Sequence, residues 1–237
     1  MAQLTLYTAK VCPFAHRTEI ALAEVGADFK RYEIDLANKP EWYASRVNPA
    51  SKVPALAYGG PDVPPEEASP ESTKIPESLV LLQLIPELFP DASTLIPKDP
   101  IVLAKARLFI ESFSSTFVPA YAALFSGQEG AEKLKAAMKT VIQARQQEGN
   151  RKYAVSDEFT IADAAVVPFI ARAELLFSKD LTKAGGSRGS EFIAEAKVDA
   201  SLKPFWDYYA LLKERESFKS TWSPDAVVVA IKKILEK

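Results

Sequence analysis

The stretch VCPFAHR, residues 11–17, contains the side chain best suited to nucleophilic chemistry. Cys12 is the only cysteine among 237 residues, and it stands between an apolar, strand-like run and a helical one. Pro13 suits the first helical position, because its fixed φ fits there and its missing N–H has no intrahelical partner to lose. Cys12 is then the helix N-cap, where backbone N–H groups and the helix dipole favour a thiolate and lower the pKa of the cysteine. The sequence therefore predicts a nucleophilic or redox-active sulfur.

The alternative for a lone cysteine is a role as a small buried hydrophobic residue, which is the commoner case in an arbitrary sequence. The Cys-Pro pair between a strand and a helix favours chemistry here. His16, the only histidine, lies four residues after Cys12, where contact between the two is possible. A thiolate already favoured by the helix needs no general base, so we expect His16 to be structural. Arg17 is expected to form an ion pair or to lie at a domain interface.

The composition argues against several functional classes. Hydrophobic residues make up 48% and charged residues 25% of the chain, and the net charge is -2. Neither nucleic acid nor an anionic membrane is therefore an expected partner. One cysteine cannot make an intrachain disulfide, which favours a reducing compartment. The sequence shows no targeting pattern and no apolar run approaching about 18 residues, so we expect a cytoplasmic protein without a membrane segment.

The elements that must position Cys12 form a strand–helix–strand unit. Residue periodicity predicts a strand over 5–8, a helix over 13–25 and a strand over 28–36. A helical crossover of about 12 residues implies that the two strands are parallel. After a short polar helix or loop, a further strand is expected to start directly after Pro54, where a missing donor is tolerated.

The following segment is punctuated by proline. Residues 59–74 are expected to be a solvated hairpin loop, followed by a brief strand at 74–75 and an apolar helix over 76–89. Ser78 can cap the first turn of that helix. Residues 90–100 are interpreted as a linker.

Beyond the linker the pattern is helical. The apolar run 101–126 predicts a long helix kinked at Pro119. Thr160 and Asp163 have the spacing of a helix N-terminal capping pair. The glycine-rich segment 183–190 is expected to be a loop. Four more helices are predicted, over 131–148, 160–178, 202–216 and 225–236.

Four separated motifs occur in order along the chain: CPFAHR, ANKPEWY with NPASKVPAL, IPES, and FTIADAAVVP. Together they resemble cytosolic glutathione transferases, nearest the omega class. They are similar to its Cys-Pro-Phe-Ala turn, its cis-proline segment, its Glu-Ser pair and the capping motif of its helical core. The resemblance implies a thioredoxin-like α/β domain over 1–89, a linker over 90–100 and an all-α domain over 101–237.

The resemblance also implies a glutathione site with Cys12 as the catalytic residue. Glu77 would accept from the γ-glutamyl ammonium, and Ser78 with the helix amides would bind the neighbouring carboxylate. The extended middle of glutathione would pair with the backbone of Val53, next to a cis Pro54.

The glycyl carboxylate of glutathione needs a cation, and Lys39 matches the family position while Lys52 is a nearby substitute. Glu77 and Ser78 could instead be ordinary helix-start residues, and Lys39 a solvated charge. The expected glutathione-binding residues are Phe14, Lys39, Lys52, Val53, Pro54, Glu77 and Ser78.

A catalytic cysteine attacks sulfur directly and gives a mixed disulfide that a second glutathione resolves. The activities implied by the resemblance are thiol transfer, deglutathionylation and dehydroascorbate reduction, with weak conjugation of electrophiles. Glutathione is the expected co-substrate, no metal is expected, and the partners are a hydrophobic or thiol-modified small molecule and a second copy in a homodimer. The second-substrate pocket is expected near Phe117, Tyr121 and Arg172, although aromatic residues at helical spacing are usually core.

Two other functions are possible on the same fold. A ligand-carrier protein for aromatic metabolites is compatible with the aromatic-rich helix over 109–125, but Cys12 favours chemistry. A chloride-channel-like protein is disfavoured, because no segment reads as a membrane span.

Overall fold

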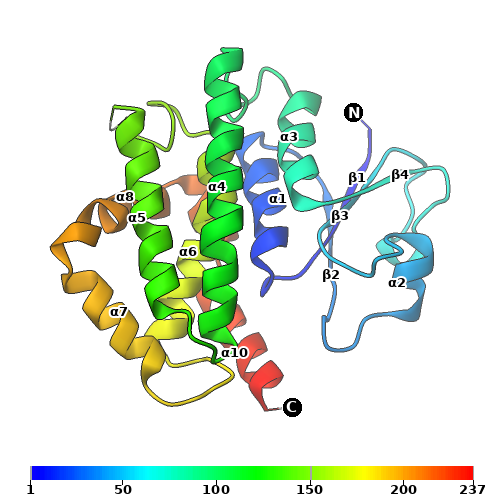
Figure 1. Cartoon of the computed structure of the whole chain (residues 1–237). Helices are drawn as coiled ribbons and strands as arrows, with labels where there is room; N and C mark the ends of the chain where they lie inside the picture. The colour runs from blue at the N-terminus through cyan, green and yellow to red at the C-terminus, as the bar shows by residue number, and fades with distance from the viewer. Residues whose placement is uncertain (1, 150, 237) are drawn as a thin grey trace. The chain divides into compact units, whose positions relative to one another are not determined.

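The computed structural model describes residues 2–149 and 151–236, which divide into two compact units (Figure 1). The first unit contains the chain up to Ser93 together with Ser220–Ser223, and the second contains the other described residues. The first unit is therefore built from two separate stretches of the sequence, which a single helical domain over 101–237 does not anticipate.

A four-stranded sheet with the order β2-β1-β3-β4 forms the centre of the first unit. Its strands β1 and β2 are parallel and joined through α1 (Pro13–Glu24), which confirms the predicted strand–helix–strand unit. Strand β3 is antiparallel to β1, and β4 is antiparallel to β3. The four strands are β1 (Leu4–Thr8), β2 (Lys30–Glu33), β3 (Ala55–Tyr58) and β4 (Thr73–Pro76). The 59–74 loop contains a short 3-10 turn, Pro65–Glu67.

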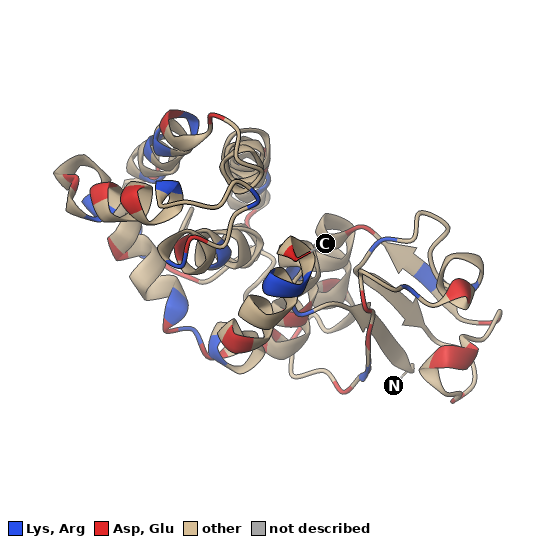
Figure 2. Cartoon of the chain, turned by 90° about the horizontal axis from the view of Figure 1, so that it is seen from below, with Lys and Arg blue, Asp and Glu red and all other residues tan. Residues whose placement is uncertain are grey.

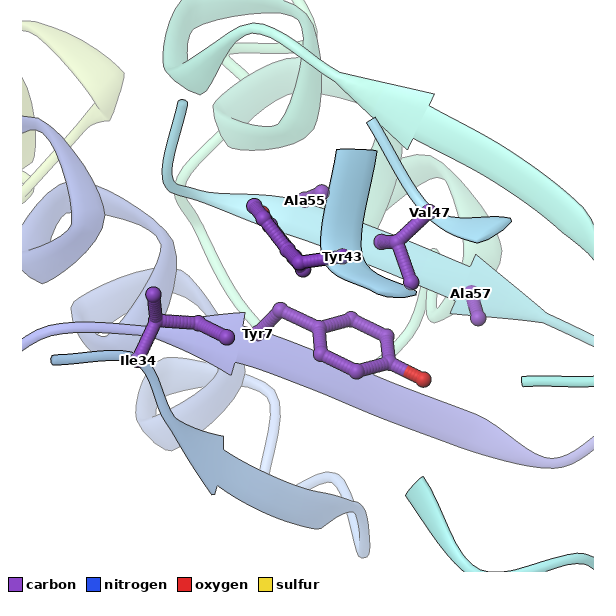
Figure 3. Packing of buried hydrophobic residues seen from close by; sticks show 6 residues of the cluster. All are labelled: Tyr7, Ile34, Tyr43, Val47, Ala55 and Ala57. Carbon is purple, nitrogen blue, oxygen red and sulfur yellow. The ribbon is translucent and has the colours of Figure 1, made fainter. Parts of the chain in front are cut away.

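Helices cover both faces of this sheet. Helices α1 and α3 (Ser78–Leu88) contact each other on one face, and α2 (Glu41–Arg46) covers the other (Figure 1). Successive strand residues point to opposite faces, and all five residues of β1 are buried, as expected for a strand covered on both sides. Figure 3 shows the apolar cluster under α2, which consists of Tyr7, Ile34, Tyr43, Val47, Ala55 and Ala57.

The second unit is helical. Helix α6 is its core, because nearly every residue from Ile161 to Phe177 is buried, and α4, α7 and α8 contact it. The fold class expected from the sequence, an α/β domain followed by an all-α domain, is confirmed. The helices are α4 (Pro100–Phe125), α5 (Ala131–Gln147), α6 (Ile161–Ser178), α7 (Arg188–Val198), α8 (Lys203–Lys213), α9 (Glu216–Thr221) and α10 (Pro224–Leu235), with a 3-10 turn at Ala200–Leu202.

The predicted capping pair at the start of α6 is confirmed. Thr160 accepts from Ala162 N, and Asp163 Oδ2 accepts from Thr160 N at 2.9 Å. Asp163 is fully buried, which raises its pKa, while hydrogen bonds from Tyr208 Oη at 2.7 Å and Ala154 N at 2.9 Å act in the opposite direction. The capping carboxylate thus also joins α6 to α8 and to the segment before it.

One prediction about the C-terminal part of the chain was wrong, because helix α7 begins inside the segment 183–190 that we expected to be a loop. The helix predicted over 202–216 is confirmed by α8, and α9 is a further short helix that lies almost entirely beyond that range. Gly189 explains the error at α7, because a Cβ built there would lie 2.8 Å from Phe177 O. The glycine permits close packing of α7 against the end of α6, rather than ending a helix. Helix α4 continues through Pro119 without interruption.

The expectation that no segment has the length and apolarity of a membrane span also needs correction. Helix α4 meets both criteria, and 33% of its most apolar 18-residue window is buried. The core helix of a soluble protein passes the same test, so this is a weak indication. Figure 2 shows lysine and arginine interspersed with aspartate and glutamate over both units.

Candidate active site

The structure confirms Cys12 as the N-cap of α1, with Pro13 as the first helical residue. Cys12 N donates to Ala9 O at 2.9 Å, which closes the turn after β1. The side chain is partly exposed and belongs to no disulfide within the described residues. Within the part of the chain that the structure describes, the sulfur makes no capping hydrogen bond to α1, and Sγ lies 3.9 Å from Val53 O, to which it donates. The thiol therefore faces the loop that precedes β3.

That loop, residues 48–54, carries Val53. The Val53–Pro54 peptide bond is cis, as predicted, and β3 begins directly after it. Ser51 adopts a positive φ of 52°, and its N–H donates to Asn48 O at 2.7 Å. Val53 is half-buried, while Pro54 is buried. The loop thus presents the backbone of Val53 beside the thiol.

The two lysines predicted to bind a carboxylate lie at this loop. Lys39 is exposed, and its Nζ donates to Ser51 O at 2.7 Å. Lys52 is exposed and precedes Val53 in the chain. Because an ammonium has three donors, Lys39 can hold the loop and still bind an anion.

Glu77 and Ser78 start α3, but not with the cap that we predicted. The N-cap is Glu77, and Ser78 is the first helical residue, so Ser78 does not cap the first turn. Glu77 is exposed and has a φ of 72°, a conformation that costs about 1–3 kcal/mol for a non-glycine residue and is concentrated at functional sites. Ser78 is buried, and its Oγ accepts from Arg17 Nη1 at 3.4 Å.

Arg17 links α1 to α3 from a buried position. It is 2% exposed, and its Cζ lies 5.4 Å from the centroid of the Phe14 ring, while Phe14 is 42% exposed. Burial lowers the pKa of Arg17 to about 10, and the negative charge of Cys12 acts in the opposite direction. Arg17 is therefore still a cation at neutral pH, in electrostatic contact with the thiol.

His16 has a structural environment, as expected from the sequence. It is 2% exposed, its Nε2 lies 2.8 Å from Thr221 Oγ1, and its ring stacks on Trp222 with 5.7 Å between centroids. Thr221 and Trp222 belong to the stretch Ser220–Ser223 of the first unit. Sequence reasoning missed both partners, because residues about 200 positions apart carry no local signal of contact.

The residues predicted for a second-substrate pocket lie in the second unit. Phe117 is 1% exposed and stacks on Phe113, with 4.5 Å between ring centroids. Arg172 is also 1% exposed and donates to Pro168 O at 3.0 Å. Tyr121 is half-buried. Phe117 and Arg172 thus contribute to the packing of the helical unit, and Tyr121 offers the more accessible surface.

Sequence reasoning also missed Tyr43 and Asn48. Tyr43 Oη and Asn48 Nδ2 both donate to Lys52 O, at 2.7 Å and 2.8 Å. Tyr43 is fully buried and Asn48 is 3% exposed. An aromatic residue on a short helix suggests only core packing, so no signal in the sequence pointed to this contact.

The first unit therefore brings a thiol, an accessible backbone segment and a helix N-terminus together with Glu77. This arrangement suits attack by sulfur on a ligand that has an extended backbone and a terminal amino acid. Among residues 2–149 and 151–236, no group of three or more His, Cys, Asp or Glu side chains is placed to hold a metal. Two cavities of about 520 and 620 Å³ are lined by other residues, so neither is the site built around Cys12.

Comparison with known proteins identifies relatives of the chain. Residues 11–88 match the family model described as glutathione S-transferase, N-terminal domain. The structure of glutathione transferase Omega 1C from Trametes versicolor is 43% identical, covers 100% of this chain and 98% of its own, and superimposes with a TM-score of 0.92.

Two further relatives are more distant. Glutathione transferase Omega 2S from Trametes versicolor, in complex with 2,4-dihydroxybenzophenone, is 37% identical over 98% of this chain and 97% of its own, with a TM-score of 0.87. Glutathione S-transferase omega-1 of Mus musculus is 27% identical over 183 residues, which are 75% of this chain and 70% of that protein.

Proposed function

The chain belongs to the glutathione transferase family and is an enzyme of the omega type, and we propose that it is a thiol transferase. The family uses glutathione as co-substrate. In this proposal the reaction passes through a mixed disulfide between glutathione and Cys12. The observation that carries the proposal is the partly exposed thiol at the N-cap of α1, 3.9 Å from Val53 O. A helix N-terminus favours the thiolate that such chemistry needs.

In this proposal glutathione extends from the N-terminus of α3, which binds its γ-glutamyl end, to the loop 48–54, which binds its cysteinyl part. Glu77 accepts from the γ-glutamyl ammonium, and the amides at the N-terminus of α3 hold the adjacent carboxylate. The exposed side chain and positive φ of Glu77 support this role. The backbone of Val53 pairs with the cysteinyl residue, which places the sulfur of glutathione beside Cys12.

The remaining contacts are with the glycyl end. Lys39 binds the carboxylate with the donors that Ser51 O does not use, and Lys52 is the second candidate. Phe14 is partly exposed and forms the apolar border of the site.

The reaction has two thiol–disulfide exchanges. The Cys12 thiolate attacks the glutathione sulfur of a glutathionylated substrate, the Cys12–glutathione disulfide forms, and the substrate leaves as a thiolate that takes up a proton. The thiolate of a second glutathione then attacks the glutathione sulfur, which releases oxidised glutathione and regenerates the Cys12 thiolate. Deglutathionylation is the activity expected from this cycle. Reduction of dehydroascorbate, in which two glutathione thiols give ascorbate and one oxidised glutathione, would share only the second exchange, which resolves the Cys12–glutathione disulfide.

A reducing compartment suits this cycle, and we infer that the protein acts in the cytoplasm. There the glutathione pool keeps Cys12 reduced between turnovers.

Cys12→Ser tests the proposed function. Serine retains N-cap character, so stability should change by less than about 0.5 kcal/mol and glutathione should bind as before. Reduction of a mixed disulfide should fall to the uncatalysed rate, because a hydroxyl forms no disulfide. Both proteins are compared under identical conditions by turnover and by mass spectrometry for the adduct of one glutathione. Wild-type turnover by Cys12→Ser would refute the proposal.

The second candidate is binding of aromatic ligands, which is favoured by the complex of the Omega 2S relative with 2,4-dihydroxybenzophenone. Tyr121 is the partly accessible aromatic residue of the predicted pocket. If binding of aromatic ligands is the function, the Cys12→Ser protein should bind 2,4-dihydroxybenzophenone with the affinity of the wild type. Tight ligand binding by a wild-type protein that shows no thiol transfer would favour the carrier function.

A further inference from the structure

The carbonyl of Lys52 is held by two buried side chains. Tyr43 Oη donates to Lys52 O at 2.7 Å, and Asn48 Nδ2 donates to the same oxygen at 2.8 Å. A carbonyl oxygen has two lone pairs, so these two donors occupy both. Tyr43 is fully buried and Asn48 is 3% exposed, which means that water competes little for either bond. We call these two hydrogen bonds the Lys52 clamp.

The clamp determines the direction of the next N–H group. The Lys52–Val53 peptide is planar and trans, because the cis bond of this loop is the one after it, between Val53 and Pro54. In a trans peptide the N–H points away from the C=O. A fixed Lys52 O therefore fixes the orientation of Val53 N–H, and two hydrogen bonds from different directions prevent the peptide plane from rotating.

Both donors of the clamp are themselves held in place. Asn48 Oδ1 accepts from Ala50 N at 3.1 Å, so its amide is bonded at both ends. The ring of Tyr43 packs in the cluster under α2 (Figure 3). The centroid of this ring lies 5.8 Å from that of Tyr7 and 6.1 Å from that of Trp42. Burial raises the pKa of Tyr43, with a further contribution from the charge of Cys12, so the hydroxyl remains a donor at neutral pH.

We propose that Tyr43 and Asn48 are positioning residues for glutathione, which orient the Val53 peptide so that it pairs with the cysteinyl backbone of the ligand. This inference rests on the proposed function, in which that pairing places the glutathione sulfur beside Cys12. Pre-organisation of this kind lowers the entropic cost of binding. Neither residue touches the reacting sulfur atoms in this proposal, so the expected loss is in affinity for glutathione, with the chemistry at Cys12 unchanged.

Tyr43→Phe removes one half of the clamp and keeps the ring. Tyr7→Phe is a matched control, since Tyr7 is 1% exposed, lies in the same cluster and donates at the same 2.7 Å to Pro65 O, which is not part of the loop 48–54. Glutathione KM and kcat are measured for the mixed-disulfide reaction, with the alkylation rate of Cys12 by iodoacetamide in the absence of glutathione. Thermal unfolding of each variant without ligand reports the structural cost.

We expect Tyr43→Phe to raise the KM for glutathione about three- to tenfold, with kcat at saturation and the alkylation rate unchanged. Tyr7→Phe should leave KM within about twofold of the wild type even if its thermal midpoint falls equally. Asn48→Ala should raise KM similarly, and the double variant Tyr43→Phe/Asn48→Ala should show non-additive coupling through the shared carbonyl.

Equal effects of Tyr43→Phe and Tyr7→Phe on KM, or no effect of Tyr43→Phe, would overturn the positioning role while leaving glutathione binding by the wild type intact. Failure of the wild type to bind glutathione at all would instead refute the proposed function, and the positioning role with it.

Discussion

Arg17 is a cation in the interior of the first unit, five residues beyond the catalytic candidate Cys12. Burial lowers the pKa of Arg17 to about 10, and the negative charge of Cys12 acts against that effect. Electrostatic interaction is mutual, so the guanidinium must stabilise the Cys12 thiolate by as much as the thiolate stabilises it. The donation to Ser78 Oγ connects the same cation to the start of α3.

Arg17→Gln should therefore make Cys12 react at higher pH. We expect the midpoint of the alkylation rate against pH to move upward by about 0.5 to 1 unit, because the thiolate loses a nearby positive charge. The measurement is the rate of iodoacetamide alkylation across the pH range.

Arg17→Lys is the control for this prediction, because it keeps the charge and loses the planar fork and its contact with Phe14. The midpoint of Arg17→Lys should stay near that of the wild type. If Arg17→Gln has an unchanged midpoint, Arg17 serves packing alone.

Some features of individual residues could be predicted from the sequence, and others could not. Cys12 as an N-cap was predictable from local chain geometry, and the cis bond before Pro54 was predictable from the resemblance of its motif to a known family. The partners of His16 were not, since Thr221 comes near it only through the tertiary fold. The Lys52 clamp was not predictable either, because the sequence does not show which oxygen accepts a hydrogen bond from the hydroxyl of Tyr43.

At the scale of elements, periodicity predicted α1, β1, β3 and α6 well, because each has a clear buried pattern or capping signal. Helix α7 was missed because glycine ordinarily disfavours a helix by about 1 kcal/mol relative to alanine. Here Gly189 is placed where a Cβ would lie 2.8 Å from Phe177 O, and this contact outweighs the propensity. Close packing between two helices depends on the tertiary structure, and the local sequence pattern does not predict it.

Gly189→Ala tests which effect is larger. Helix propensity alone would stabilise the protein by about 1 kcal/mol. We expect a net destabilisation of about 1–3 kcal/mol, since the methyl group overlaps a backbone oxygen that cannot rotate away. Urea unfolding measures the difference.

Ala194→Gly in the exposed part of α7 is the matched substitution, and it should cost about 1 kcal/mol by propensity alone. A Gly189→Ala protein that is more stable than the wild type would show that α7 can move away from α6 at little cost.

The whole molecule has an apolar surface on α4 that its own unit leaves uncovered. Ile101 is 64% exposed and Leu108 is 69% exposed, and their spacing of seven residues places them on one face of the helix. Exposed apolar residues aligned on one face are typical of interfaces between subunits. We propose that this face contributes to a homodimer.

Leu108→Glu should then weaken self-association by at least about 100-fold, because the interface would have to bury an unpaired charge. Sedimentation at micromolar concentration measures the change. Val198→Glu is the control, since Val198 on α7 is 82% exposed and its replacement should leave the dimer intact. A wild-type protein that sediments as a monomer would refute the proposed homodimer.

The return of Ser220–Ser223 to the first unit has a consequence for synthesis on the ribosome. The strands, α1 and the loop with Val53 all lie within the first 93 residues. The two residues that contact His16, Thr221 through its hydroxyl and Trp222 through its ring, are translated only after α4 to α8. At about 5–20 residues per second, that delay is on the order of ten seconds. A nascent chain therefore carries the segment with Cys12 for that interval while the surroundings of His16 are still incomplete.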